Sequence, residues 1–467
     1  MLVTLVSRIG AILKVKPVDV QEIRDSKTNP MRIRPALKVE GRLSIPGDKS
    51  ISHRAAIIAA LAQGTSELAH FATGQDCAST LSCLRELGVP VERDDNRVRI
   101  TGVGLKALQA TSAELDCGNS GSTMRMMAGV LAGQGFTTSL KGDASLSTRP
   151  MARVIEPLER MGAQIGSREG KPPLTIKGAS NLNAIEYEPS VASAQVKSCV
   201  LFAGLQAKGR TVVRERQATR DHTERLLNCF GVPVEIKRYD EGVAEIGIQG
   251  QVTPVARNLR IPGDLSSAAF FIAAAALLAN SDLEITGVGL NPTRIQFLSI
   301  CRTLGLDVSF VTGEEECNEP VGTILIRGTQ EHTAQTHLSN TLPEVVIPQL
   351  IDELPLLAVV ATRVAGGLSI RKAKELRFKE SDRIASTVKN LRAMGVEVDE
   401  FPDGLNVPGP QPLLGAQLES FGDHRIAMAF TVAALVAESD SVLAGSECVS
   451  VSFPEFYQLL DSVLSRN

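Results

Sequence analysis

Ile45-Pro46-Gly47-Asp48 and Ile261-Pro262-Gly263-Asp264 are two copies of one motif within this sequence of 467 residues. The copies start 216 residues apart, and serines and an alanine-rich segment follow each of them. An aspartate after such a turn is typical of a helix N-cap, because its carboxylate accepts hydrogen bonds from the first free N–H groups of the helix. We therefore expect two similar halves, each with a capped helix near its start.

A shorter repeat divides each half into three units. Six segments rich in Ala, Leu and Val run into a turn residue and a strand-like stretch, at residues 55–64, 124–135, 199–209, 268–281, 354–366 and 426–439. Successive turns are 71 to 85 residues apart. A repeat of this length is typical of stacked supersecondary units. Because the segments are apolar on all sides, they predict buried helices.

A second helical pattern follows in five of the units. It carries charge on one face, which predicts a position outside the first helix. Each ends in a glycine that suits a helix C-cap: Gly88, Gly162, Gly231, Gly305 and Gly395. Each unit is therefore expected to run strand, helix, strand, helix, strand, which predicts an α/β fold.

The two halves predict two domains, since the chain is longer than one hydrophobic core usually supports. We expect the first three-repeat domain at residues 47–260 and the second at 36–46 plus 261–467, with a hinge near residue 260. Residues 1 to about 33 fit none of the repeats, and we assign 1–35 to an N-terminal extension.

Charge and hydropathy exclude several classes of protein. The 49 Lys and Arg nearly balance the 52 Asp and Glu, so the chain has no polycation signature for nucleic acid. No apolar run reaches the roughly 20 residues that a membrane span needs. The first eight residues have no basic segment ahead of their apolar stretch, which argues against a secretory signal. We expect a soluble, cytoplasmic protein.

Cysteines and histidines indicate neither a metal site nor a disulfide framework. The eight cysteines contain no C-x-x-C pair, and Cys199, Cys229 and Cys301 lie in apolar helical patterns, where reduced thiols pack as small hydrophobes. This favours a reducing cytosol. The six histidines include no pair four residues apart, the spacing that a zinc-binding helix uses, so we assign no metal.

Cations stand at the starts of several predicted buried helices. Lys49, Arg54, Arg125, Lys197 and Arg425 lie in the first one or two turns. The neighbouring Ser, Asn and Asp residues are N-caps in the simplest interpretation. However, the helix dipole makes a cation unfavourable at this end, so a bound anion is expected to compensate. Several such ends suggest polyanionic small molecules bound in a cleft.

Other motifs are weaker when each is considered alone. The glycine-rich turn at 118–123 does not match a P-loop. Arg149-Pro150 and Arg220-Asp221-His222-Thr223-Glu224 could be solvated loop charges. The densest charged run, 375–383, could be a salt-bridged helix start.

Five motifs in one order nevertheless resemble one family. They are Pro46-Gly47-Asp48-Lys49-Ser50-Ile51-Ser52-His53-Arg54, Gly118-Asn119-Ser120-Gly121, Ser193-Ala194-Gln195, Leu376-Arg377-Phe378-Lys379-Glu380-Ser381-Asp382-Arg383 and Asp423-His424-Arg425. From about residue 37 to the C-terminus, the sequence resembles the 5-enolpyruvylshikimate-3-phosphate synthase family. The resemblance implies two domains, each of three repeats around buried parallel helices, which close on substrate. It also implies a monomer of the shikimate pathway that needs no cofactor or metal.

The resemblance also assigns roles to residues. The residues that look like shikimate 3-phosphate ligands are Lys49, Ser50, Arg54, Ser193, Ala194, Gln195, Arg220, Asp352 and Lys379. Those on the phosphoenolpyruvate side are Lys49, Gly121, Arg149, Gln195, Arg383 and Arg425. Asp352, Glu380 and Lys49 are the catalytic candidates.

The chemistry of this reaction needs such residue types. Both substrates carry a phosphate and a carboxylate, and planar Arg suits both groups, as Arg149, Arg383 and Arg425 would. The shikimate 5-hydroxyl adds to C2 while C3 gains a proton, and phosphate leaves while C3 loses one. We expect Asp352 to be the base for the hydroxyl, with Lys49 as a partner.

Glu380 is our candidate for proton transfer at C3. Two positions depart from the family's pattern. Val451 stands where some members have Lys, and Ala194 stands where some have a second Ser, which leaves only its backbone to bind. Because Gly121 is present rather than Ala, we expect inhibition by glyphosate, a compact anion that would occupy the phosphoenolpyruvate site.

Two other functions would explain part of the sequence pattern. The related UDP-N-acetylglucosamine enolpyruvyl transferase usually has a Cys five residues before the Arg-Pro of its loop, where this chain has Ala144, and Lys49-Ser50 does not match its Lys-Asn pair. A non-catalytic repeat protein that binds phosphorylated metabolites would need the cations, but not Asp352 and Glu380 together.

Overall fold

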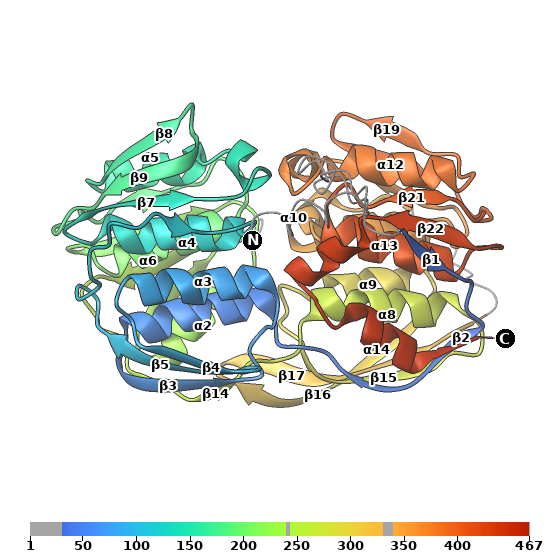
Figure 1. The fold of residues 1–467 in the computed structure, drawn as a ribbon, viewed down its shortest axis with the longest axis horizontal. Helices are drawn as coiled ribbons and strands as arrows, with labels where there is room; N and C mark the ends of the chain where they lie inside the picture. Colours follow the sequence, from blue (N-terminus) through green and yellow to red (C-terminus); the bar gives the residue numbers. More distant parts are fainter. Residues whose placement is uncertain (1–29, 240–242, 330–339, 467) are drawn as a thin grey trace, which may run out of the picture.

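The six apolar segments form six buried helices, three in each half of the chain. The computed structural model describes residues 30–239, 243–329 and 340–466. The helices are α2 (Lys49–Leu61), α4 (Gly121–Ala132), α6 (Ala194–Gly204), α8 (Leu265–Leu277), α11 (Leu354–Ala361) and α13 (His424–Leu435). All thirteen residues of α8 are buried, as its apolar surface on every side predicts. Figure 1 shows the two halves as lobes that lie side by side.

The second helix of each unit lies further out, as predicted. These helices are α3 (Gln75–Glu86), α5 (Ala152–Arg160), α7 (His222–Cys229), α9 (Gln296–Thr303) and α12 (Arg383–Ala393), and the sixth unit has α14 (Phe456–Val463). The five predicted C-cap glycines all have φ between +81° and +111°. A residue with a Cβ atom is strained there, so glycine is the residue that ends these helices without cost.

Each of the first four units has one strand more than expected, because a hairpin follows the outer helix; the fifth unit also has this hairpin, but no strand precedes its buried helix α11 among the described residues. The second unit, for example, runs β6 (Leu115–Asp116), α4, β7 (Thr137–Lys141), α5, β8 (Gln164–Arg168) and β9 (Lys171–Lys177). Its strands form a sheet in the order β6-β7-β9-β8, in which β6 and β7 are parallel and the rest antiparallel.

The other sheets of the first half have the same form. One has the order β14-β3-β5-β4 and the other β10-β11-β13-β12. Their strands are β3 (Gln63–Ala69), β4 (Val91–Asp94), β5 (Arg97–Val103), β10 (Glu186–Tyr187), β11 (Arg210–Glu215), β12 (Val234–Arg238), β13 (Ala244–Gln249) and β14 (Leu259–Arg260).

The second half has three sheets, in the orders β16-β17-β15-β2-β23, β18-β20-β19 and β1-β22-β21. Their strands are β1 (Met31–Ile33), β2 (Lys38–Ser44), β15 (Asp282–Gly289), β16 (Asp307–Glu316), β17 (Glu319–Arg327), β18 (Leu368–Ile370), β19 (Asp399–Phe401), β20 (Gly404–Val407), β21 (Gln417–Glu419), β22 (Ser441–Ala444) and β23 (Leu464–Ser465). Short helices connect some elements: η1 (Leu146–Thr148), η3 (Glu344–Val346), α10 (Ile347–Leu350), η4 (Lys374–Phe378) and η5 (Ser446–Val451).

The chain passes between the halves at the two copies of the repeated motif. Strand β2 lies in a sheet of the second half, whereas β14 pairs with β3 of the first half. The two passages bond to each other, since Asp48 N donates to Pro262 O (2.7 Å) and Asp264 N donates to Pro46 O (3.0 Å). A Cβ atom at Gly47 would overlap the carbonyl oxygen of His70, so this close crossing requires glycine.

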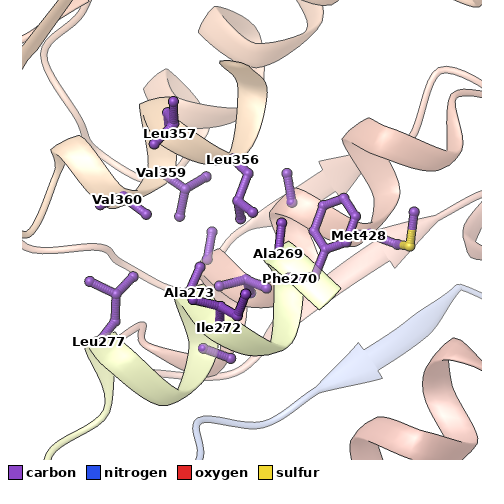
Figure 2. Close-up of a cluster of buried hydrophobic side chains, with 14 of the residues drawn as sticks. Ala269, Phe270, Ile272, Ala273, Leu277, Leu356, Leu357, Val359, Val360 and Met428 are labelled. Atoms are coloured by element: carbon purple, nitrogen blue, oxygen red, sulfur yellow. The ribbon is translucent and has the colours of Figure 1, made fainter. Parts of the chain in front are cut away.

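Each half has its own hydrophobic core. One cluster of buried side chains runs from Ile51 to Ile261, and the other contains residues 33–45 and 265–463. Figure 2 shows the centre of the second cluster, where Ala269 and Ala273 of α8 face Leu356 and Val359 of α11. Small alanines let these helices approach, and buried large side chains contribute about 2 kcal/mol each.

The start of the described chain differs from the sequence-based expectation. Residues 31–33, which we had assigned to the N-terminal extension, form β1 and pair with β22. Ile33 is buried in the second core, which explains the pairing, and residues 1–29 lie outside the described part of the chain.

Among the residues the structure describes, none of the helices is long and apolar enough to cross a bilayer.

The prediction that Cys229 is a reduced thiol was wrong. Cys229, at the end of α7, forms a disulfide with Cys317 in the turn between β16 and β17. The helical pattern could not reveal this partner, because the two residues are 88 positions apart and only the tertiary fold brings them together. Cys199 and Cys301 are buried free thiols, as expected.

Candidate active site

The N-terminal ends of the buried helices line one cavity between the two halves. Among the cavity residues are Lys49 at the start of α2, Gly121 of α4, Ala194 of α6, Ser266 of α8 and Arg425 of α13, and Asp352 stands just before α11. Each helix directs unpaired N–H groups and the positive end of its dipole into this space. The arrangement therefore favours anionic ligands.

Thirteen of the fourteen predicted site residues line this cavity. They are Lys49, Ser50, Gly121, Arg149, Ser193, Ala194, Gln195, Arg220, Asp352, Lys379, Glu380, Arg383 and Arg425. The fourteenth, Arg54, is buried in α2 and is not among the lining residues. Its guanidinium donates to Thr223 Oγ1 (2.7 Å), Ser198 Oγ (2.9 Å) and Ser50 O (2.8 Å). Arg54 thus supports the wall that carries Ser50.

The lining has a strong excess of positive charge. It contains ten Lys and Arg against five Asp and Glu, although the whole chain has a formal net charge of -3. A local concentration of cations in a protein of slightly negative charge indicates a site for small anions.

Lys49 keeps its positive charge in this environment. Its Nζ lies 2.7 Å from Oδ2 of Asp76, on the neighbouring helix α3. Burial would lower the pKa of Lys49, but the Asp76 carboxylate raises that pKa above its ordinary value. Lys49 is therefore a cation and a hydrogen-bond donor before substrates bind.

Two further cations of the first half, Arg125 and Arg149, lie near the start of α4. Arg125 donates to Oε1 of Gln195 (2.7 Å), and Gln195 donates in turn to Ser122 Oγ (2.8 Å). Burial, together with Arg149 and Arg153 nearby, lowers the pKa of Arg125 to about 10. Arg149 donates to Asn119 Oδ1 (2.8 Å) and contacts Glu380 Oε1 (3.2 Å) across the cavity. A bound anion would offset the repulsion between these buried cations.

Asp352 is surrounded by cations from both halves. Its carboxylate lies 2.9 Å from Arg220, 3.2 Å from Arg383 and 3.5 Å from Lys379. Burial would raise the pKa of Asp352, but Lys379 and Arg220 hold it well below its usual range. Asp352 is thus ionised, and a ligand that occupies these cations would raise its pKa and make it a better base.

Glu380 is also ionised. Its Oε2 accepts a hydrogen bond from Arg383 (2.6 Å). Burial opposes ionisation, but Arg383 and Arg149 hold the pKa of Glu380 well below its usual range. Arg383 is fixed in turn by Asp423, the N-cap of α13, through a contact of 2.8 Å. The site therefore presents two ionised carboxylates, each held by arginines.

Several cavity residues were missed by sequence reasoning. Arg125 is a predicted cation at a helix start, but no motif gives it a role in the site. Asp76 and Arg294 were not singled out at all. Arg294 contacts both repeated aspartates, Asp48 and Asp264, at 3.2 Å. No motif marks Arg294, and only the crossing of the two halves brings it to the site. The described residues contain no group of three or more His, Cys, Asp or Glu that could hold a metal ion.

Comparisons with known proteins identify the family of this chain. The sequence model of the family described as EPSP synthase (3-phosphoshikimate 1-carboxyvinyltransferase) matches residues 33–460. A 3-phosphoshikimate 1-carboxyvinyltransferase of Koribacter versatilis is 48% identical over 93% of this chain and 99% of its own length.

Solved structures give the same result. The EPSP synthase of Acinetobacter baumannii superposes with a TM-score of 0.81 at 38% identity, over 94% of this chain and 98% of that protein. The enolpyruvyl transferase NikO of Streptomyces tendae has a TM-score of 0.70 over 94% of this chain and 98% of its own, but its 17% identity shows a common fold alone. The family match, the identity and the shared enolpyruvyl transferase fold together show that this chain belongs to the EPSP synthase family.

Proposed function

We propose that the protein transfers the enolpyruvyl group of phosphoenolpyruvate to the 5-hydroxyl of shikimate 3-phosphate and releases phosphate. This is the shikimate-pathway reaction of the EPSP synthase family to which the chain belongs. The observation that carries the proposal is the ionised Asp352, held among cations of both halves in a cavity with an excess of positive charge. Two phosphorylated carboxylates fit a cavity of this charge.

We assign the two substrates to overlapping groups of residues. The ligands proposed for shikimate 3-phosphate are Lys49, Ser50, Ser193, Ala194, Gln195, Arg220, Asp352 and Lys379, with Arg54 acting through the wall behind them. Those proposed for phosphoenolpyruvate are Lys49, Gly121, Arg149, Gln195, Arg383 and Arg425. Lys49 and Gln195 belong to both groups, which would bring the two substrates into contact.

The proposed mechanism has two steps. In the first, the 5-hydroxyl oxygen bonds to C2 of phosphoenolpyruvate, the hydroxyl proton passes to Asp352, and C3 receives a proton. In the second, C3 loses a proton, the C2–C3 double bond forms again, and the C2–O bond to phosphate breaks. We propose that Glu380 carries the proton at C3. Phosphoenolpyruvate bound to Arg149 and Arg383 would weaken the hold of these arginines on Glu380 and raise its pKa, so that Glu380 would take up a proton in the complex, give it to C3 in the first step and take one back in the second. The atoms balance with the two substrates alone, so the proposal includes no cofactor.

Binding of the substrates would activate Asp352. The phosphate of shikimate 3-phosphate would take hydrogen bonds from Arg220, whose Nη2 lies 2.9 Å from Asp352 without completing a hydrogen bond to it. The negative phosphate would also weaken the hold of Lys379 on Asp352. Both changes raise the pKa of Asp352 toward a value that suits a general base.

The remaining assignments are also proposals. We propose a first domain at 47–260 and a second at 36–46 plus 261–467, to which β1 adds residues 31–33 of the extension. The separate cores and the crossing at Gly47 and Gly263 support this division. We also propose that the protein acts as a cytoplasmic monomer, as expected from the sequence.

The test is phosphate release by purified protein given phosphoenolpyruvate and one of two acceptors. Release with shikimate 3-phosphate alone is the expected result. Release with UDP-N-acetylglucosamine alone would assign the chain the activity of the related transferase. Binding of shikimate 3-phosphate without phosphate release in the presence of either acceptor would indicate a non-catalytic binding protein.

A further inference from the structure

One loop of the first half meets one segment of the second half across the cavity. The loop contains η1 and runs into α5, and the segment runs from η4 toward α12. Ser145 Oγ donates to Glu380 O (3.3 Å), and Arg149 contacts the Glu380 carboxylate (3.2 Å). Arg153 and Glu375 make the third contact. These contacts join parts of the chain more than 220 positions apart.

The Arg153–Glu375 contact has the geometry of a specific ion pair. Nη1 of Arg153 donates to Oε2 of Glu375 at 2.6 Å, and Nη2 donates to Oε1 at 2.8 Å. The two parallel bonds fix both position and orientation, which a single contact would not do. Burial would raise the pKa of Glu375, but the hydrogen bond and charge of Arg153 lower it. The carboxylate is therefore ionised when the halves are in contact.

The place of this pair separates it from the chemistry. Both side chains line the cavity but keep 29% and 32% of their exposure, whereas Arg149 and Arg383 are almost fully buried. Figure 1 shows α5 and α12 at the end of their lobes opposite the strands β14 and β17, near which the chain crosses. Neither Arg153 nor Glu375 is among the proposed substrate ligands. The pair thus bridges the halves at the rim, away from the covalent connection.

We propose that Arg153 and Glu375 are a positioning pair that holds the two halves of the site together around the substrates. The inference rests on the proposed function, because it assigns the pair to substrate retention. Arg153 acts by keeping the loop that carries Arg149 against the second half. Loss of the pair would leave the catalytic groups in place within each half but would favour a state in which the halves lie apart, so substrate binding would have to bring them together before an unchanged catalytic complex forms. The Michaelis constants would then rise, while kcat would change little.

Charge exchange tests this role. Arg153→Glu and Glu375→Arg each place two like charges at the rim, and each should raise the KM for shikimate 3-phosphate about tenfold with kcat within about threefold. The double variant R153E/E375R recreates the pair in reverse and should return KM to within about threefold of the wild type. Such recovery requires direct contact between the two side chains.

The control is Arg210 and Glu235, another Arg–Glu pair with two hydrogen bonds (3.1 and 2.9 Å), which lies within one sheet of the first half. The exchange R210E/E235R should leave both constants unchanged. A second readout does not depend on turnover: amide hydrogen exchange at residues 375–380 should become faster in each single variant and return to the wild-type rate in the double variant.

Three results would overturn the proposal. The first is a double variant with a KM no better than that of the worse single variant, which would indicate that the side chains contact substrate individually. The second is single variants with unchanged KM and unchanged hydrogen exchange. The third is an equal rise in KM in the control variant R210E/E235R. If the wild type released no phosphate, the proposed function would fail. The rates of amide hydrogen exchange in the variants would still decide whether the pair joins the halves.

Discussion

Replacement of Asp352 by Asn tests the proposed mechanism most directly. Asn keeps the size of the side chain but cannot accept the hydroxyl proton. Loss of a general base usually lowers the rate by about 10²- to 10⁴-fold, equivalent to about 3 to 5 kcal/mol. We therefore expect kcat of Asp352→Asn to fall by at least 100-fold.

The structure predicts that the same substitution does not weaken the binding of shikimate 3-phosphate. Asp352 lies 2.9 to 3.5 Å from Arg220, Arg383 and Lys379. At an effective dielectric constant of about 20, each such pair has a gross attraction of about 5 kcal/mol, most of which desolvation offsets. The Asn variant releases these cations for the phosphate. Its Kd for shikimate 3-phosphate should therefore be equal to or lower than that of the wild type.

Two assays on the same preparation separate these effects. Phosphate release gives kcat, and calorimetric titration with shikimate 3-phosphate gives Kd. Asp461→Asn, an exposed carboxylate of α14, is the control and should change neither. A variant that kept more than a tenth of the wild-type kcat would refute the role of Asp352 as base. A Kd weakened as much as kcat/KM would show that Asp352 serves binding alone.

Three further predictions concern the site and its support. In Gly121→Ala the new Cβ would lie 2.7 Å from Arg125 Nη1, so the guanidinium must move; KM for phosphoenolpyruvate should rise, and inhibition by glyphosate should weaken at least tenfold relative to a sensitive wild type. Arg294→Met leaves two buried carboxylates without their shared cation and should lower the urea-derived unfolding free energy by about 3 to 5 kcal/mol. Burial, with Lys49 nearby, holds the pKa of both His53 and His424 well below its usual value. As the pH falls below about 6.5, these two histidines therefore gain a proton in the unfolded chain but not in the folded one. Stability in urea should then drop by up to about 1.4 kcal/mol per pH unit for each histidine.

Each of these predictions has a contrary outcome. Full wild-type activity in high glyphosate would contradict the assignment of Gly121 to the phosphoenolpyruvate site. Arg302, an exposed residue of the following helix α9, is the control, and Arg302→Met should leave the unfolding free energy unchanged. An equal loss of unfolding free energy in both variants would contradict the role of Arg294. An unfolding free energy that stays constant between pH 7.5 and 5.5, or one that His53→Gln does not make less steep, would contradict the histidine prediction.

The sequence predicted those features that depend on local pattern. Helices such as α8 are apolar on every side, and this fixes their place at the centre of a lobe. Glycines such as Gly88 mark helix ends because only glycine takes their positive φ without strain. Candidate site residues such as Lys49, Gly121 and Arg425 could be found because they stand at the starts of these helices, where backbone N–H groups and cations coincide. Arg149, Arg220 and Glu380 lie outside these helices, and their predicted roles come from the family resemblance.

Features that depend on the tertiary arrangement were not predictable in this way. Arg294 is recognised only when the two passages at Asp48 and Asp264 meet around it. The added strand of each hairpin escaped because short exposed strands such as β4 lack a clear alternation of apolar residues. The motif of Arg54 predicts that it binds shikimate 3-phosphate, but its position in α2 turns its guanidinium toward Thr223.

The disulfide between Cys229 and Cys317 changes how the two lobes are connected. Without it, two stretches of backbone join them, and a protease cut near residue 262 would leave fragments held by non-covalent contacts alone. With it, the chain from 229 to 317 closes into a ring that contains this second passage. A molecule nicked there would still migrate as one species on a denaturing gel, and would separate into two pieces only after reduction. The disulfide is thus a further covalent connection between the lobes of this enzyme, in addition to the two backbone passages.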